Sequence, residues 1–156
     1  MDPTPPSAVV TPRFSVTIDS RLELVAVVAD LTRIACASIG LAEIDDVEIA
    51  VVEAVSNVIT HAYGGEPGHP VHVRFASNAS WLRVDVQDYG KKLDEARLAG
   101  ARMPVANDVC DLPERGYGLA LIKQVMHEIG YQSAGGQNTL SMMRSVESSV
   151  ALARCV

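Results

Sequence analysis

Two amphipathic helical patterns stand one after the other in this chain, with strand-like segments on both sides of them. The first covers 21–39, where Ser20 precedes it and Glu23 has the spacing of a capping box. The second covers 46–62. Because apolar residues recur in both with helical period, each helix must bury one face against another layer. The predicted inward residues are Leu24, Val27, Val28, Leu31, Ile34 and Ala35 in the first helix, and Val47, Val51, Ala54, Val55, Val58 and Ala62 in the second.

The other periodic segments predict five strands and one more long helix. They are, in chain order, the strands 13–19, 71–77 and 80–88, the helix 118–129, and the strands 130–134 and 138–146. Hairpins outnumber crossovers in this order. It therefore predicts an α+β fold, a two-layer α/β sandwich with helices on one face of a mixed, mainly antiparallel sheet. Residues 89–115 show only a possible short helix near Leu93–Leu98, and loops of this length are usually functional or disordered.

The composition favours one globular domain and excludes several classes of protein. With 156 residues, of which 48% are hydrophobic, we expect a domain at 13–147 between a flexible N-terminal tail at 1–12 and a C-terminal tail at 148–156. No apolar run is long enough to span a bilayer. The net charge of −6 argues against direct nucleic-acid binding. Three widely spaced cysteines fit a reducing compartment, so we expect a cytoplasmic protein that does not bind membranes.

Glu53, Asn57 and His61 follow one another at intervals of four residues on the second predicted helix. They form a polar stripe beside the apolar one and should border the core. Unpaired polar groups there cost about 1–3 kcal/mol each, so they need partners. A hydrated Mg²⁺ ion would suit Asn57, and Glu53 could orient or deprotonate a nucleophile. The alternative is an ordinary solvated helix edge, and we expect His61 to be a packed or supporting residue.

Asp88 ends the third predicted strand on the same side as Leu82, Val84 and Val86. Since strand side chains alternate, its carboxylate should point toward the core and needs a donor, such as the exocyclic amine of adenine. Gly90 would let a ring approach the backbone closely. The alternative is a simple Asp-x-Gly turn after a strand.

The segment Arg115-Gly116-Tyr117-Gly118-Leu119 opens the last predicted helix. Glycines at a helix N-terminus expose backbone N–H groups to anions, and a triphosphate would fit there. The segment is neither a Walker A loop nor a Rossmann fingerprint. A flexible hinge before a helix is the other interpretation.

These three features, in this order and in these structural contexts, resemble the GHKL ATPases, and within them the anti-sigma factor serine/threonine-protein kinases of bacterial partner-switching systems. EIAVVEAVSNVITHAYGG resembles the family's N box, VDVQDYGKKLDEA its first glycine box and ERGYGLALIKQVMHEIG its second. NTLSMMRSV resembles its closing strand. The resemblance runs from about Phe14 to Val146 and implies the Bergerat ATP-binding fold.

The resemblance implies a role for each matched residue. Glu53 would be the catalytic base for a serine or threonine hydroxyl, Asn57 would bind Mg²⁺, and Asp88 would bind adenine with Gly90 beside it. Residues from about 91 to 115 would form a lid over ATP. The remaining nucleotide-binding residues would be Arg115, which could reach the γ-phosphate, and Gly116, Tyr117, Gly118 and Leu119.

The implied function is a kinase that uses Mg-ATP to phosphorylate a small anti-sigma-factor antagonist and that holds a sigma factor in alternation with it. A homodimer is expected, with 21–39 as the candidate interface. One departure from the family pattern is Lys91-Lys92-Leu93, where many relatives have a second glycine or a proline. It keeps open a nucleotide-dependent binding module without significant kinase activity, and a structural domain without nucleotide is a third possibility.

Overall fold

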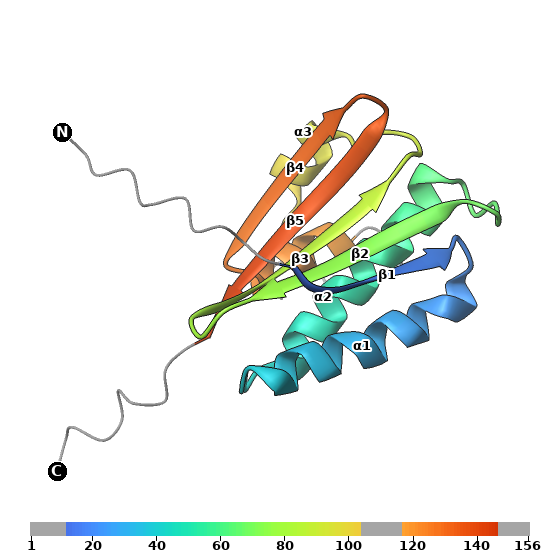
Figure 1. Ribbon diagram of the computed structural model, residues 1–156. Helices are drawn as coiled ribbons and strands as arrows, with labels where there is room; N and C mark the ends of the chain where they lie inside the picture. The colour runs from blue at the N-terminus through green and yellow to red at the C-terminus, as the bar shows by residue number, and fades with distance from the viewer. Residues whose placement is uncertain (1–11, 104–116, 147–156) are drawn as a thin grey trace, which may run out of the picture.

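The computed structural model describes residues 12–103 and 117–146, which form one sheet with helices packed on one of its faces (Figure 1). The sheet has five strands in the order β1-β2-β3-β5-β4, and its four neighbouring pairs are antiparallel. The strands are β1 Pro12–Asp19, β2 Pro70–Ser77, β3 Trp81–Asp88, β4 Glu128–Ala134 and β5 Gln137–Ser145. The predicted α+β sandwich and mainly antiparallel sheet are confirmed, although no pair of the described strands is parallel, so the sheet is not mixed.

Two long helices and two short ones complete the described fold. They are α1 Val25–Ser38, α2 Ile44–Asn57, α3 Glu95–Gly100 and α4 Gly118–Val125. A 3-10 turn at Leu22–Leu24 precedes α1, and α2 continues as a π turn, Val58–Ala62. Asp94 caps α3, because its carboxylate accepts hydrogen bonds from the backbone N–H groups of Ala96 and Arg97. None of the described helices is long and apolar enough to cross a membrane.

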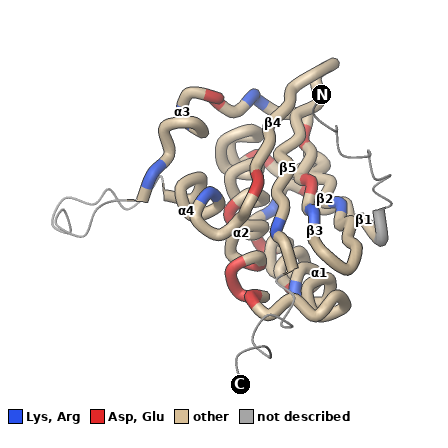
Figure 2. The backbone as a smooth tube through the Cα atoms, turned by 90° about the vertical axis from the view of Figure 1, so that its left-hand side faces the viewer, with Lys and Arg blue, Asp and Glu red and all other residues tan. Residues whose placement is uncertain are grey.

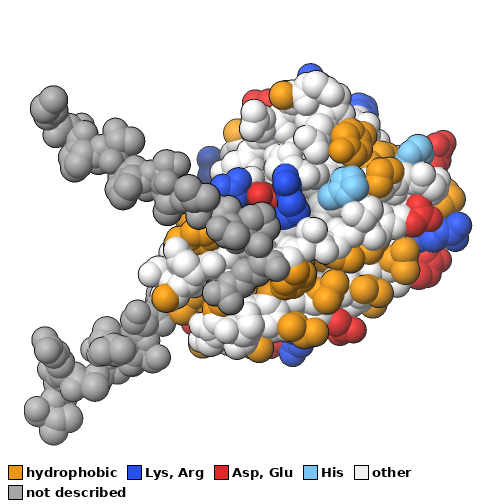
Figure 3. Space-filling view, viewed as in Figure 1, with side chains coloured by type: hydrophobic (Ala, Val, Ile, Leu, Met, Phe, Trp, Pro, Cys, Tyr) orange, Lys and Arg blue, Asp and Glu red, His pale blue; other side chains and the backbone are white. Residues whose placement is uncertain are grey.

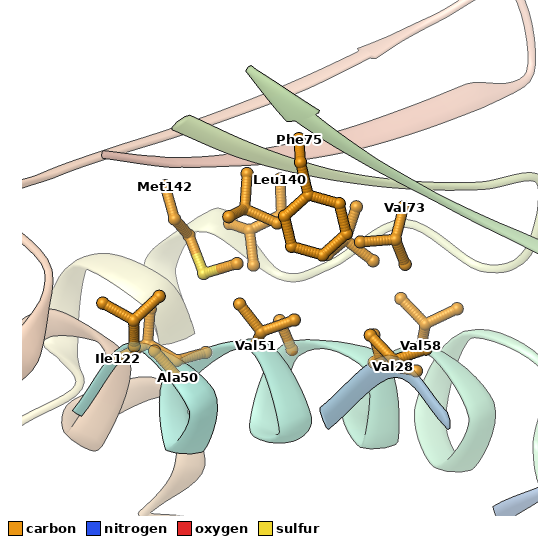
Figure 4. Close-up of a cluster of buried hydrophobic side chains, with 14 of the residues drawn as sticks. Val28, Ala50, Val51, Val58, Val73, Phe75, Ile122, Leu140 and Met142 are labelled. Carbon is orange, nitrogen blue, oxygen red and sulfur yellow. The ribbon is translucent and has the colours of Figure 1, made fainter. Parts of the chain in front are cut away.

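The core lies between the sheet and the helix layer (Figure 4). Phe75 from β2 and Met142 from β5 point down toward α2, where Val51 is fully buried. Ile122 brings α4 into the same core. The β3 side chains that alternate toward the helices, Val84 and Val86, are also fully buried. This packing fixes α2 and α4 against the sheet and against each other.

The predicted start and inward face of the first helix are partly wrong. Ser20 does not cap it: its hydroxyl donates to Glu66 O at 2.6 Å, and the helix begins only at Val25. Val27 and Ile34 are 45% and 61% exposed. The residues buried in their place are Val25, Thr32 and Cys36 beside the expected Val28 and Ala35. Because α1 carries apolar residues on more than one face, its period did not select the buried face, and packing against α2 decided it.

The last predicted helix is too long at its C-terminus. The helix α4 ends at Val125, and Met126 adopts an extended backbone with ψ 141°. His127 then donates its backbone N–H to Met143 O, which starts the β4–β5 pairing. Ile129, predicted inside the helix, therefore lies in β4, since its apolar character suits a half-buried strand equally well.

Candidate functional site

Glu53 and Asn57 lie in the second half of α2, and both are half-buried. His61 does not continue their stripe, because the helix widens into the π turn, where Tyr63 N–H donates to Val58 O five residues back. The His61 side chain is exposed, so the expectation of a packed residue is wrong. Single π turns inside helices occur often at functional sites.

Gly118, the first residue of α4, packs directly against this pair. A Cβ at position 118 would overlap Glu53 Oε2 and would lie 3.3 Å from Asn57 Nδ2. Any side chain at this position would require the Glu53 carboxylate to move away. The structure thus brings together a carboxylate and an amide from α2 with the N-terminus of another helix.

Asn57 carries a buried atom without a partner: its Nδ2 makes no hydrogen bond with the described part of the chain. Such an atom is costly unless something else satisfies it. A flip of the Asn57 side-chain amide would exchange Nδ2 and Oδ1 and place the oxygen at this buried position. An amide oxygen is a ligand that Mg²⁺ accepts while keeping several waters. The donor chemistry at Asn57 therefore fits a hydrated cation.

Asp88 is 5% exposed and lies at the core side of the sheet, as its strand position predicts. Its Oδ1 accepts two hydrogen bonds, from Gly90 N–H and from Asn138 Nδ2, both at 2.8 Å. Among the described residues no donor reaches Oδ2, so this oxygen is left for one further donor.

Asn138 is a site residue that sequence reasoning missed. It is 2% exposed, lies opposite Asp88 in the β3–β5 pairing, and also donates to Gly90 O at 3.0 Å. The only sequence signal was a polar residue at the start of the closing strand, and its significance depends on the strand register.

Gly90 contacts the end of the π turn. A Cβ at position 90 would come within 2.5 Å of Ala62 O, and the next residue, Lys91, donates its backbone N–H to the same oxygen at 2.9 Å. The glycine is thus required by the protein's own backbone, whatever ligand lies nearby. The loop after Asp88 is held against the helix that carries Glu53 and Asn57.

Two tyrosines hold the backbone near Asp88. Tyr63 OH donates to Pro70 O at 2.7 Å and accepts from Tyr89 N–H at 2.9 Å. Tyr131 OH accepts from Leu93 N–H at 2.9 Å. Burial raises the pKa of both hydroxyls, so both stay protonated at neutral pH.

The start of α4 is formed by Tyr117, Gly118 and Leu119. Tyr117 is half-buried at the N-cap position and makes no side-chain cap bond, while Leu119 is 7% exposed in the core. Leu119 can therefore offer a ligand only its backbone N–H. Arg115 and Gly116, also predicted as site residues, lie outside the described residues, as does the part of the predicted lid at 104–115. The N-terminus of α4 is a suitable place for an anion next to Glu53 and Asn57.

The chain belongs to the histidine kinase-like ATPase domain family, whose sequence profile matches residues 18–144. Within that family it is similar to serine-protein kinase RsbW of Bacillus cereus, with 31% identity over 133 residues that cover 82% of each chain. It is also 37% identical over 97 residues to RsbW of Bacillus velezensis and 25% identical over 113 residues to an anti-sigma F factor of Anoxybacillus flavithermus. The last match covers 72% of this chain and 76% of the relative.

The match to the B. velezensis protein covers only 60% of each chain, so the two are alike over part of their length. Among solved structures, the RsbU and RsbW domains of a Mycobacterium tuberculosis protein match with a TM-score of 0.57 at 20% identity, over 86% of this chain and 33% of that one. This likeness supports the fold alone, and the predicted family and fold are confirmed together.

Proposed function

We propose that this chain is an anti-sigma type serine/threonine-protein kinase that binds Mg-ATP and phosphorylates a small antagonist protein. The observation that carries the proposal is the contact of Gly118 with Glu53 and Asn57. It brings the predicted phosphate-binding start of α4 next to the predicted catalytic base and Mg²⁺ ligand on α2. Phosphoryl transfer needs mainly positioning and charge neutralisation, and this arrangement can supply both. The names of the relatives, RsbW serine-protein kinases and an anti-sigma F factor, agree with it.

Each residue of the site has a definite task in this proposal. Asp88 Oδ2 accepts a hydrogen bond from the adenine amino group. The first N–H groups of α4, at Gly118 and Leu119, face the phosphates. Asn57 would hold Mg²⁺, which would supply positive charge to neutralise the phosphates. Arg115 and Gly116 remain proposed phosphate-binding residues on the basis of the family pattern.

Glu53 is the proposed catalytic base. It accepts the proton of a serine or threonine hydroxyl as that oxygen bonds to the γ-phosphorus of ATP. The bond from phosphorus to the β-phosphate bridging oxygen breaks, and ADP leaves. The half-buried carboxylate beside Gly118 supports this role, since a base must lie at the phosphate end of the nucleotide.

The partners proposed are the antagonist, a sigma factor and a second copy of this chain. Three apolar side chains are exposed on α1 and the 3-10 turn before it: Leu22 in the turn at 57%, and Val27 and Ile34 in the helix at 45% and 61%. Figure 3 shows apolar side chains across the lower part of the molecule, where α1 lies in Figure 1. Exposed apolar groups of this kind support an isologous contact.

The test is phosphorylation of the antagonist by Mg-ATP, followed by mass spectrometry. The wild type should yield one phosphoserine or phosphothreonine, and Glu53→Gln should abolish it. Glu66→Gln is the matched control, because this carboxylate is 79% exposed and, among the described residues, pairs with His69 alone. Binding of nucleotide and antagonist without any phosphoprotein would instead support a nucleotide-dependent binding module, the alternative left open by Lys91-Lys92.

A further inference from the structure

Arg144 is an arginine on the core side of the sheet. Along β5 it lies on the same strand face as Leu140 and Met142, which are buried and face the helices. Its side chain is only 14% exposed. A largely buried guanidinium is unfavourable unless partners compensate for the lost water, so its contacts indicate what it does.

The partners of Arg144 lie at the ends of two helices. Nη1 donates to Val125 O, the last residue of α4. Nη2 lies 3.8 Å from Glu43 Oε2 and 3.7 Å from Asp46 Oδ2, at the N-cap and in the first turn of α2. Figure 2 shows acidic residues gathered at the lower end of α2. The cation thus meets the negative end of α4 and the acidic start of α2 at once.

The opposite ends of these two helices form the candidate site. Gly118 at the start of α4 contacts Glu53 and Asn57 in the second half of α2. With eight residues, α4 is about 12 Å long, so Arg144 acts one helix length away from that contact. A helix this short, without a side-chain cap at its start, depends on external contacts for its position.

We propose that Arg144 is a positioning residue that fixes α4 along α2 and thereby holds Gly118 against Glu53 and Asn57. Its role in phosphate binding rests on the proposed function, but the positioning itself does not. Lys123 also holds α4 in place, because its Nζ donates to Leu98 O and Ala99 O and so connects α4 to α3. Among the polar contacts of the described residues, those of Arg144 alone join α4 to both the sheet and α2, in addition to the apolar packing of Ile122.

The first arm of the test needs no nucleotide. In ¹⁵N-labelled protein, Arg144→Gln should shift the resonances of the Gly118 backbone amide and the Asn57 side-chain amide. Arg83→Gln is the matched control, since Arg83 is a strand arginine with an ion pair to Asp85 at 2.9 Å and a hydrogen bond to Ser141, and none to α2 or α4. Unchanged site resonances in Arg144→Gln, or equal changes in both variants, would overturn the proposal.

The second arm separates phosphate binding from base binding by calorimetry. Arg144→Gln should weaken ADP binding by about 10-fold, equal to about 1.4 kcal/mol, while adenosine binding stays as in wild type. Equal loss for both ligands would mean general destabilisation and would contradict positioning. A wild type that binds neither ligand would reject the proposed function, and the resonances would still decide the role of Arg144.

If Arg144→Gln does not fold, Arg144→Lys takes its place in both arms. Lysine keeps the charge but not the planar fork that reaches both helices. It should give the same shifts at Gly118 and Asn57 with a smaller ADP defect. Wild-type resonances and wild-type ADP affinity in a folded Arg144→Lys protein, together with an Arg144→Gln protein that fails to fold, would assign Arg144 a purely structural role.

Discussion

Asn138 Nδ2 donates to Asp88 Oδ1 across 2.8 Å and so connects the end of β3 to the start of β5. Both side chains are buried, and Asn138 also donates to Gly90 O. The carboxylate proposed to select adenine is therefore held in one orientation before any ligand arrives. Because the Asp88 carboxylate is already ordered, nucleotide binding does not have to include the free-energy cost of ordering it.

Asn138→Ala should lower both stability and affinity for adenine nucleotides. Loss of a buried donor leaves Asp88 underpaired, which costs about 1–3 kcal/mol of unfolding free energy, and ADP affinity should fall about 10-fold. Denaturant unfolding and calorimetry measure the two effects. Asn78→Ala is the control, because Asn78 Oδ1 only accepts from Ser80 and Trp81 in an exposed hairpin turn. Full ADP affinity in Asn138→Ala would show that Asp88 needs no such support.

The Glu53–Asn57 spacing and the inward phase of Asp88 could be predicted because each depends on local geometry. Spacing by four places two residues on one helix edge, and strand alternation places Asp88 with Leu82, Val84 and Val86. These positions can be predicted because they depend only on residue spacing along one helix or on side-chain alternation along one strand.

Other parts of the site depend on how the elements meet, which the sequence does not display. Asn138 matters through its register with Asp88, and Arg144 through its distance to the ends of α2 and α4. The same cause explains the wrong inward positions of Val27 and Ile34, since their helix carries apolar residues on more than one face and its packing against α2 selects the buried one. Tertiary contact overrides local period in each case.

Tyr63→Phe should destabilise the protein and make its unfolding free energy less sensitive to alkaline pH. The hydroxyl bridges Pro70 O and Tyr89 N–H, so its loss should cost about 1–2 kcal/mol at neutral pH. Burial raises the pKa of Tyr63, so its contribution is complete below the unfolded value and is lost as pH rises through the higher folded value. Urea unfolding between about pH 9 and pH 11 should show a smaller decline in the variant. Parallel declines would exclude Tyr63 as a cause.

Cys36 should resist alkylation in the native protein. Its thiol is fully buried in α1, and burial raises its pKa to about 11, so almost no thiolate forms at pH 8. Cys110 and Cys155 lie outside the described residues, so the measurement uses a variant with serine at both positions. Iodoacetamide should label Cys36 only after denaturant is added, as mass spectrometry can follow. Rapid labelling of the folded protein would mean that α1 opens locally.

Gly118→Ala provides the sharpest test of the site, because two physical effects predict opposite signs. By helix propensity, alanine at an α4 position should stabilise the protein by about 1 kcal/mol. The added Cβ, however, would overlap Glu53 Oε2, and overpacking costs about 1–3 kcal/mol. Because this carboxylate ends a flexible, half-buried side chain, it can move aside, so we expect stability close to that of wild type and at least about a 10-fold loss of ADP affinity, measured by urea unfolding and calorimetry. Gly130→Ala is the control, since a Cβ there meets nothing within 4 Å. Unchanged ADP affinity in Gly118→Ala would show that nucleotide binding does not depend on the close approach of Gly118 to Glu53, and the proposed phosphate site would lose its main support.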